Sequence, residues 1–141
     1  MEPARLFEIV NTAVLPAWLL LLAAPRWNWT QRLAGFLAPA ALSVTYLAVL
    51  ATHWGEGDGG GFGSLAEVTR LFQSPWILLG GWIHYLAFDL FIGAWQTRDS
   101  FQANVPRPVL FVTLPLTLMF GPVGLLLYLA VRTARQRSVD L

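Results

Sequence analysis

Four long apolar stretches separated by polar segments dominate the pattern of the chain. They cover residues 6–24, 33–52, 75–96 and 109–131, and they contain very few charged side chains. A helix needs about 20 mostly apolar residues to cross a hydrocarbon core of about 30 Å, because it rises 1.5 Å per residue. The pattern therefore predicts an all-α integral membrane protein, with residues 1–141 forming a single transmembrane domain built as a four-helix bundle.

The connection between the second and third stretches has two parts. The first contains six glycines between positions 55 and 63, and we interpret it as a flexible linker. The second contains Ser64 and Glu67 in the S-x-x-E pattern of a capping box, followed by apolar residues at helical spacing. This predicts a short interfacial helix between spans two and three. Ser74 and Pro75 then form a typical start for the third span.

Composition supports the membrane assignment and narrows the chemistry. Hydrophobic residues make up 56% of the chain and charged residues 12%, about half the charged fraction of a typical soluble domain. Cysteine and lysine are absent, which excludes disulfides, thiolate ligands and Schiff-base chemistry. The net charge of +1 and the lack of a basic run argue against a nucleic-acid partner. We expect the lipid bilayer to be the main partner.

The arginines do not orient four spans. Both termini and the glycine-rich loop would share a side that carries five arginines, against four on the opposite side. The positive-inside rule needs a larger asymmetry than this. The alanine-rich composition, in which every cationic residue is arginine, leads us to expect the inner (cytoplasmic) membrane of a bacterium. The sequence leaves homo-oligomerisation open.

The third stretch, GGWIHYLAFDLFIGAW at residues 80–95, carries two ionisable groups in an apolar setting. At about 100° per residue, His84, Tyr85 and Asp89 fall on one half of the helix, which we expect to face the bundle interior. The other half, expected to face lipid, contains Ile83, Leu86, Ala87, Leu90 and Ala94.

Asp89 lies near the middle of this span, where a bare carboxylate costs at least about 2.5–3.5 kcal/mol. It should therefore be partnered or protonated, and a protonated carboxyl can give a proton to a substrate oxygen and take one back. His84 is five residues earlier, about 140° around and about 7.5 Å along the helix. We predict that His84 and Asp89 form a catalytic acid/base pair that contacts two points of one elongated ligand. The alternative is that both are structural and hydrogen-bonded within the bundle.

Other polar and aromatic residues are candidates for lining the same site. Pro115 and Pro122 each release a backbone carbonyl one turn earlier in the fourth stretch, which leaves an acceptor for an interior group. A haem site would need histidines at similar depth, but His53 lies at a span boundary and His84 about nine residues into the next span. Two histidines are too few for a di-iron site, and no nucleotide-binding loop is present, so we expect no metal and no cofactor. The predicted substrate-binding residues are Trp82, Tyr85, Phe88, Trp95, Asn11, Tyr46 and Thr117.

The motifs WIHYLAFDLF at residues 82–91 and FGPVGLL at residues 120–126 resemble one family. It is the abscisic-acid-deficient-four-like family of small four-helix membrane proteins. Leu6-Phe7, Pro16 and Ala24-Pro25 match its opening in order and spacing, so the resemblance covers nearly the whole chain. Its plant members are required to form neoxanthin from violaxanthin, a redox-neutral isomerisation of a carotenoid epoxide.

The resemblance implies a carotenoid or another long apolar ligand as partner. Together with the acid/base pair it leads us to expect a cofactor-free isomerase of the neoxanthin-forming type, acting on carotenoid or polyprenoid pigments. The alternative is a carotenoid- or lipid-binding accessory protein that uses the same cavity without turnover. A proton-coupled transporter, which four spans could form only as an oligomer, is a weaker alternative.

Overall fold

The computed structural model describes residues 2–57 and 59–136, and within these residues all regular secondary structure is helical. Three helices are long and apolar enough to cross a membrane: α1 (Pro3–Ala23), the continuous helix Thr30–Glu56, and α5 (Pro75–Gln102). They correspond to the first three apolar stretches of the sequence. The prediction of membrane helices is thus confirmed for length and composition.

The second long helix is built from four consecutive pieces. These are α2 (Thr30–Arg32), the π-helical segment η1 (Leu33–Leu37), α3 (Ala38–His53) and the 3₁₀ turn η2 (Trp54–Glu56). Pro39 has no N–H to offer the carbonyl four residues earlier, and the wider π-helical turn lies directly before it. The helix therefore continues through a proline that could have ended it.

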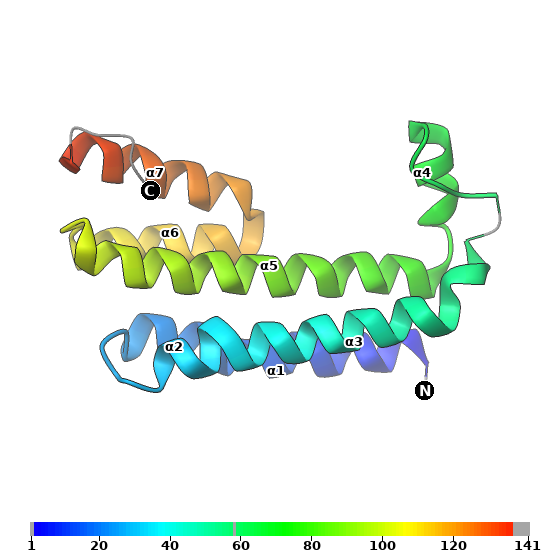
Figure 1. Cartoon of the computed structure of the whole chain (residues 1–141), viewed down its shortest axis with the longest axis horizontal. Coiled ribbons are helices and arrows are strands. Elements are labelled where there is room, and N and C mark those ends of the chain that lie inside the picture. The colour runs from blue at the N-terminus through cyan, green and yellow to red at the C-terminus, as the bar shows by residue number, and fades with distance from the viewer. Residues whose placement is uncertain (1, 58, 137–141) are drawn as a thin grey trace.

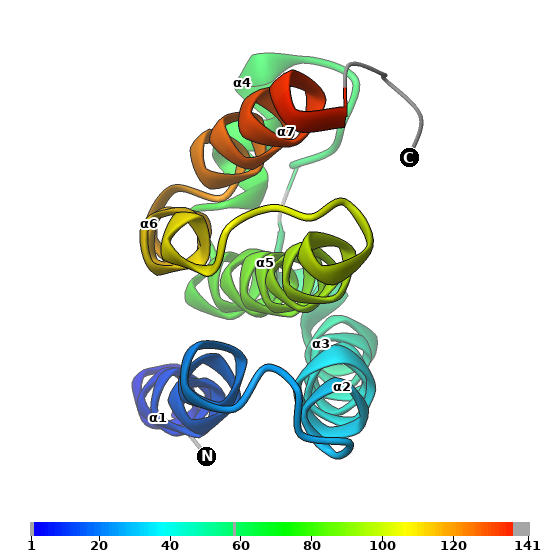
Figure 2. The same cartoon turned by 90° about the vertical axis from the view of Figure 1, so that its left-hand side faces the viewer.

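The central helix is α5, which lies between two layers. Figure 1 shows α1 and α3 along one side of α5 and the last two helices, α6 (Arg107–Phe120) and α7 (Pro122–Gln136), along the other side. The view along the long axis in Figure 2 places α5 between these layers. Every other long element thus packs on α5.

A short helix, α4 (Leu65–Leu71), lies where the sequence predicts one, and Ser64 caps it as predicted; its place at a membrane surface stays a prediction. The Glu67 N–H donates to Ser64 Oγ at 3.2 Å, and Glu67 Oε2 accepts from the Gly63 N–H at 3.0 Å. Ser74 and Pro75 begin α5, with the Ile77 N–H facing Ser74 Oγ at 3.5 Å. The helix α4 stands at the end of the molecule where α5 begins (Figure 1).

The predicted fourth span, residues 109–131, is wrong as a single helix, and the fold is therefore not a bundle of four spans. The chain turns at Gly121 (φ +34°), so α6 and α7 form an antiparallel hairpin (Figure 1). Pro122 lacks the N–H needed to continue α6, and only glycine tolerates such a φ well. With 14 residues, α6 is about 21 Å long, too short to cross a bilayer alone.

The predicted lipid-facing side of the third span is also wrong. Its apolar residues, from Ile83 (0% exposed) to Leu90 (0% exposed), are buried. On the same stripe, a side chain at Gly80 would contact Val49 and Leu50 of α3. Lipid and a neighbouring helix are both apolar, so hydrophobicity alone does not distinguish a lipid-facing surface from a helix-packing one.

The hairpin changes which arginines share an end of the molecule. The α1–α2 and α5–α6 connections and the last turns of α7 lie together at one end (Figure 1). We call it the arginine-rich end, and its described arginines are Arg26, Arg32, Arg98, Arg107, Arg132 and Arg135. The opposite end has Arg5 and Arg70. The positive-inside rule gave no orientation for four spans. With the hairpin, it favours the arginine-rich end as the side of the membrane from which the protein is inserted.

Candidate functional site

A stripe of polar side chains runs along the face of α5 that packs against the α6–α7 hairpin. Its members are Tyr85, Asp89, Gln96 and Asp99, which follow each other at spacings of four, seven and three residues. These spacings place them on one helical face. The last three are buried and Tyr85 is half-buried. Each meets a residue of the hairpin, and together they form the candidate site.

Asp89 lies near the middle of α5, directly against the turn of the hairpin. Its side chain is buried, with 9% of the residue exposed. A Cβ atom built on Gly121 would lie 2.7 Å from Asp89 Oδ1, so the close approach itself requires glycine at this position. Among the described residues, Asp89 Oδ2 has no hydrogen-bond partner. A buried carboxyl oxygen without a partner is costly, which makes Asp89 the strongest candidate for a functional group.

Tyr85 lies one turn before Asp89, and its hydroxyl donates to the backbone carbonyl of Leu118 at 3.0 Å. Leu118 is four residues before Pro122, so its carbonyl is the one that this proline leaves without a helical partner. The expectation that Pro122 exposes an acceptor toward the interior is thereby confirmed. The phenol lies one helical turn from Asp89 on the same face of α5. Tyr85 therefore links the hairpin turn to the acid.

One layer further along the stripe, an amide and a hydroxyl join α5 to α6. Gln96 Nε2 donates to Thr117 Oγ1 at 3.0 Å, and Thr117 Oγ1 in turn lies 2.8 Å from the Thr113 carbonyl. All three residues are fully buried. Thr117, predicted to bind substrate, is thus engaged in a contact between helices. Thr113 Oγ1 is buried and has no partner among the described residues.

At the arginine-rich end, Asp99 forms a buried cluster with two residues of α7. Arg132 Nε donates to Asp99 Oδ2 at 2.8 Å and Arg132 Nη2 to Oδ1 at 3.2 Å, while the Tyr128 hydroxyl donates to Oδ2 at 2.6 Å. Sequence reasoning missed this cluster, because Arg132 resembled an ordinary arginine at the end of a span. The regular spacing from Asp89 to Asp99 on one face was the available signal.

His84 does not share this site. Its ring is exposed and lies on another side of α5, stacked on Phe88 (centroids 4.5 Å apart) and edge-on to Tyr46 (5.6 Å). The predicted inward orientation of His84 is therefore wrong: His84 lies on an exposed face of α5 and Asp89 on a buried face. The role of either residue in catalysis stays a prediction.

The remaining predicted residues are distributed around α5. Trp82 Nε1 donates to Asn11 Oδ1 at 2.8 Å, which joins α5 to α1 at the exposed surface of the molecule. The Trp95 ring is edge-on to Tyr128 at 5.4 Å, next to the Asp99 cluster. Phe88 is exposed. The two contacts join α5 to different neighbouring helices, α1 and α7. Of the predicted aromatic residues, Trp82 and Tyr85 lie together, with ring centroids 5.3 Å apart, while Trp95 and Phe88 lie elsewhere on α5.

Several clefts of moderate size surround the long helices. His84 and Tyr46 line one of about 290 Å³, and Phe88 lines another of about 250 Å³ between α3 and α5. Trp82 lines a third, of about 270 Å³, beside α1. Asp89 lines none of these three clefts. They therefore do not form a single tunnel that joins the predicted residues. Within residues 2–57 and 59–136, no group of three or more His, Cys, Asp or Glu could hold a metal ion.

Comparison with known proteins agrees with the resemblance drawn from the motifs. A profile of the family described as ABA DEFICIENT 4-like (ABA4-like) matches residues 5–128. A curated relative, "Protein ABA DEFICIENT 4, chloroplastic" of Arabidopsis thaliana, is 28% identical over 130 residues, which cover 86% of this chain and 58% of the relative.

This chain thus spans less than two thirds of the length of that relative. No solved structure matches. Because the relative is chloroplastic, the bacterial cytoplasmic membrane expected from composition has no support from the comparison. The matched residues run from within α1 through α4, the polar stripe of α5 and the hairpin turn at Gly121 into α7. The chain belongs to the ABA DEFICIENT 4-like family.

Proposed function

We propose that this protein acts on a carotenoid or related polyprenoid in the membrane, as a cofactor-free isomerase whose acid/base group is Asp89. The family is related to neoxanthin synthesis in plants. The observation that carries the proposal is the buried Asp89 carboxyl, which has an unpartnered oxygen and lies at the hairpin turn near the middle of the longest helix.

A single carboxyl is sufficient for the isomerisation that the resemblance suggests. The protonated acid gives its proton to the epoxide oxygen as one carbon–oxygen bond breaks. The resulting carboxylate then removes a proton from the adjacent polyene carbon, and the electrons of that C–H bond form the new allenic double bond. The product is an allenic alcohol, the carboxyl is protonated again, and no electron donor or acceptor is consumed. His84 is therefore not needed as a second catalytic group.

Access to Asp89 would be lateral, from the lipid. Tyr85 is half-buried beside the carboxyl, and the exposed Trp82 lies next to Tyr85, with ring centroids 5.3 Å apart. Met119 and Phe120, both exposed, directly precede the hairpin turn along the chain. A long polyene could rest on these apolar side chains with its end ring at the turn. Because Asp89 itself is only 9% exposed, binding requires the turn at Gly121 to move away from α5. Glycine at this turn supports such a movement.

Pigment analysis in a host that accumulates a carotenoid epoxide tests the proposal. We expect wild type to convert the epoxide to an allenic product, and Asp89→Asn, which keeps the size of the side chain, to abolish conversion. His84→Gln is the matched control and should retain conversion, because it removes an ionisable group of the same helix that lies outside the site. Retained conversion in Asp89→Asn would contradict the proposed role.

The second candidate is a carotenoid-binding protein without turnover. It is favoured by the lipid-facing clefts of about 250–290 Å³ along α5, which are lined by aromatic and aliphatic side chains and do not include Asp89. Pigment that co-purifies with wild type and with Asp89→Asn, with no change in its structure, would support this candidate over the isomerase.

A further inference from the structure

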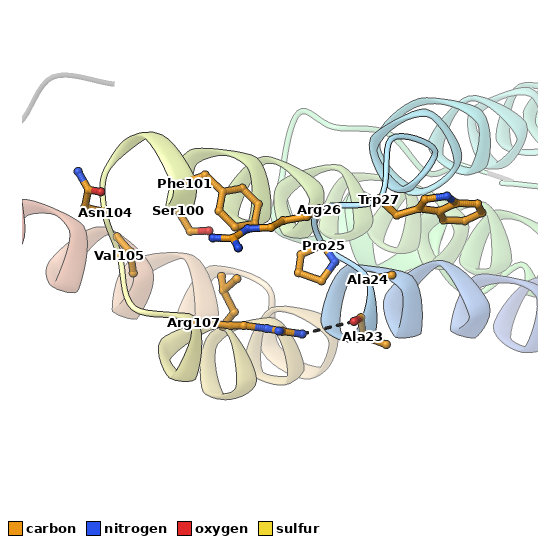
Figure 3. A pocket seen from close by; sticks show the side chains of 11 residues that line it. Ala23, Ala24, Pro25, Arg26, Trp27, Ser100, Phe101, Asn104, Val105 and Arg107 are labelled. Carbon is orange, nitrogen blue, oxygen red and sulfur yellow. Dashed lines mark hydrogen bonds between the residues drawn. The ribbon is translucent and has the colours of Figure 1, made fainter.

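A cavity of about 440 Å³ opens at the arginine-rich end, between the α1–α2 and α5–α6 connections (Figure 3). This volume is within the range of about 300–1,000 Å³ that small-molecule sites occupy. Two arginines contribute to its wall and no acidic residue does. Its lining residues are Ala23, Ala24, Pro25, Arg26, Trp27, Ser100, Phe101, Asn104, Val105, Arg107 and Leu110.

Arg107 reaches across the cavity from the start of α6 to the end of α1. Its Nη2 donates to the carbonyls of Leu22 and Ala23 at 3.2 and 3.3 Å, which satisfies two acceptors at a helix C-terminus. Figure 3 shows the contact with Ala23. Its other N–H groups make no hydrogen bond within the described part of the chain. The guanidinium is thus held in place by one edge and retains donors for a ligand.

Arg26 approaches the same space from the α1–α2 connection. Its guanidinium carbon lies 5.2 Å from the centroid of the Phe101 ring, and Figure 3 shows the side chain extending toward Phe101 and Ser100. Among the described residues it has neither a hydrogen-bond partner nor a carboxylate partner. The nearby acid Asp99 is occupied by Arg132 and Tyr128. Two arginines therefore converge on one cavity without an anion to balance them.

We propose that this cavity binds the phosphate group of an anionic phospholipid. Guanidinium groups match phosphate oxygens in geometry and charge. The cavity lies where α1 ends and α6 begins, next to the exposed ring of Trp27, and tryptophan is typical of headgroup depth. Leu110 and Ala23 give the cavity apolar walls toward the membrane, where the glycerol backbone and the first acyl carbons of the lipid fit.

Binding of short-chain lipids to the purified protein in detergent tests this site. Dioctanoyl phosphatidylglycerol should bind more tightly than dioctanoyl phosphatidylcholine, measured by isothermal titration calorimetry. The double variant Arg26→Gln/Arg107→Gln should lose roughly tenfold or more in affinity for phosphatidylglycerol, because two charge-assisted contacts are removed. The matched control Arg32→Gln/Arg98→Gln removes the same charge at the same end, outside the cavity, and should bind as wild type does.

The single variant Arg26→Gln distinguishes lost lipid binding from misfolding. Arg107 also holds the end of α1, so its loss could destabilise the fold, whereas Arg26 has only a ring contact. Arg26→Gln should weaken phosphatidylglycerol binding without lowering the thermal stability of the protein. Equal binding of the two lipids, or an equal loss in the control variant, would overturn the proposal. Glycerol 3-phosphate is the third ligand: if it binds as tightly as phosphatidylglycerol, the cavity recognises a soluble phosphate ester and the assignment to a lipid fails.

Discussion

The two packed faces of α5 are held together by different kinds of contact. Against α1 and α3, the buried surface is almost entirely apolar, with Ile83, Leu90 and Ala94 at its centre. Against the α6–α7 hairpin, the buried surface carries the polar stripe from Tyr85 to Asp99, and each polar residue meets a partner or a tight turn. In the apolar interior of a membrane, polar contacts specify which helices pack together, while apolar contacts contribute mainly through the fit of the helix surfaces.

The comparison also separates structure from chemistry. The apolar face of α5 buries no titratable group, whereas the hairpin face buries two aspartates that differ in their hydrogen-bond partners. Asp99 is paired with Arg132, and Asp89 has an oxygen without a partner among the described residues. Satisfied polar groups stabilise a fold, and an unsatisfied one suggests function. The difference between the two aspartates is therefore the basis for assigning the site to Asp89.

The largest effect should come from breaking the Asp99 cluster. Asp99→Asn removes the buried carboxylate that pairs with the Arg132 guanidinium, and breaking a buried ion pair costs about 3–5 kcal/mol. We expect α7 to detach from α5, and the thermal midpoint of the protein in detergent to fall sharply. Arg98→Gln, on the neighbouring exposed position, should leave the midpoint unchanged.

The opposite face provides the second arm of that experiment. Leu90→Ala removes a fully buried side chain from the apolar face, but lipid is also apolar, so mainly the cavity term of about 2 kcal/mol remains. If Leu90→Ala destabilises the protein as much as Asp99→Asn does, the two faces are not held by different contacts and the comparison fails.

An intermediate effect is expected at the hairpin turn. Gly121→Ala places a Cβ atom 2.7 Å from Asp89 Oδ1 and adds backbone strain at φ +34°, together costing about 2–3 kcal/mol. The free energy of unfolding and the pigment conversion should both fall. Gly55→Ala is the control, because a Cβ atom there meets nothing within 4 Å.

A second substitution separates the two causes at the turn. In the Gly121→Ala background, Asp89→Ser shortens the side chain that the new methyl group meets, so it should recover the part of the stability lost to contact but not the part lost to strain. No recovery at all would mean that the approach of Asp89 to the turn has no energetic consequence.

The sequence predicts the apolar face of α5 and the hairpin face of α5 to different extents. Apolar length identified the helices that begin at Pro3, Thr30 and Pro75, and the S-x-x-E pattern identified α4, because these features depend on local chemistry. Asp89 and His84 were both predicted to point inward, and only Asp89 does, since a helical wheel gives angles between residues but not the position of neighbouring helices. The break at Gly121 was hidden because glycine and proline also occur within continuous membrane helices.

The Asp99 cluster shows a further limit. Asp99 and Arg132 are 33 residues apart, and they meet only because α7 turns back along α5. A continuous fourth helix would have placed Arg132 at the opposite end of the molecule. Without the hairpin, the sequence could give neither the ion pair nor the asymmetry between Arg5 and Arg70 at one end and the six described arginines at the other.

The smallest effects test the hairpin face at single hydroxyl groups. Thr113 and Thr117 are both fully buried in α6, and each can be replaced by valine with almost no change in shape. Thr117 Oγ1 accepts from Gln96, while Thr113 Oγ1 has no partner in the described structure. Thr117→Val should therefore cost about 0.6–1 kcal/mol, the value of one hydrogen bond between membrane helices. Thr113→Val should be neutral or slightly stabilising, because it removes an unsatisfied hydroxyl.

Chemical unfolding of the two valine variants in detergent, run beside wild type, resolves this difference. The third variant is Gln96→Leu combined with Thr117→Val, which removes both partners and should cost less than the sum of the two single substitutions. If Thr113→Val is as destabilising as Thr117→Val, then the Thr113 hydroxyl has a role that its buried position does not reveal. In that case, the contrast between satisfied and unsatisfied groups on this face would no longer single out Asp89.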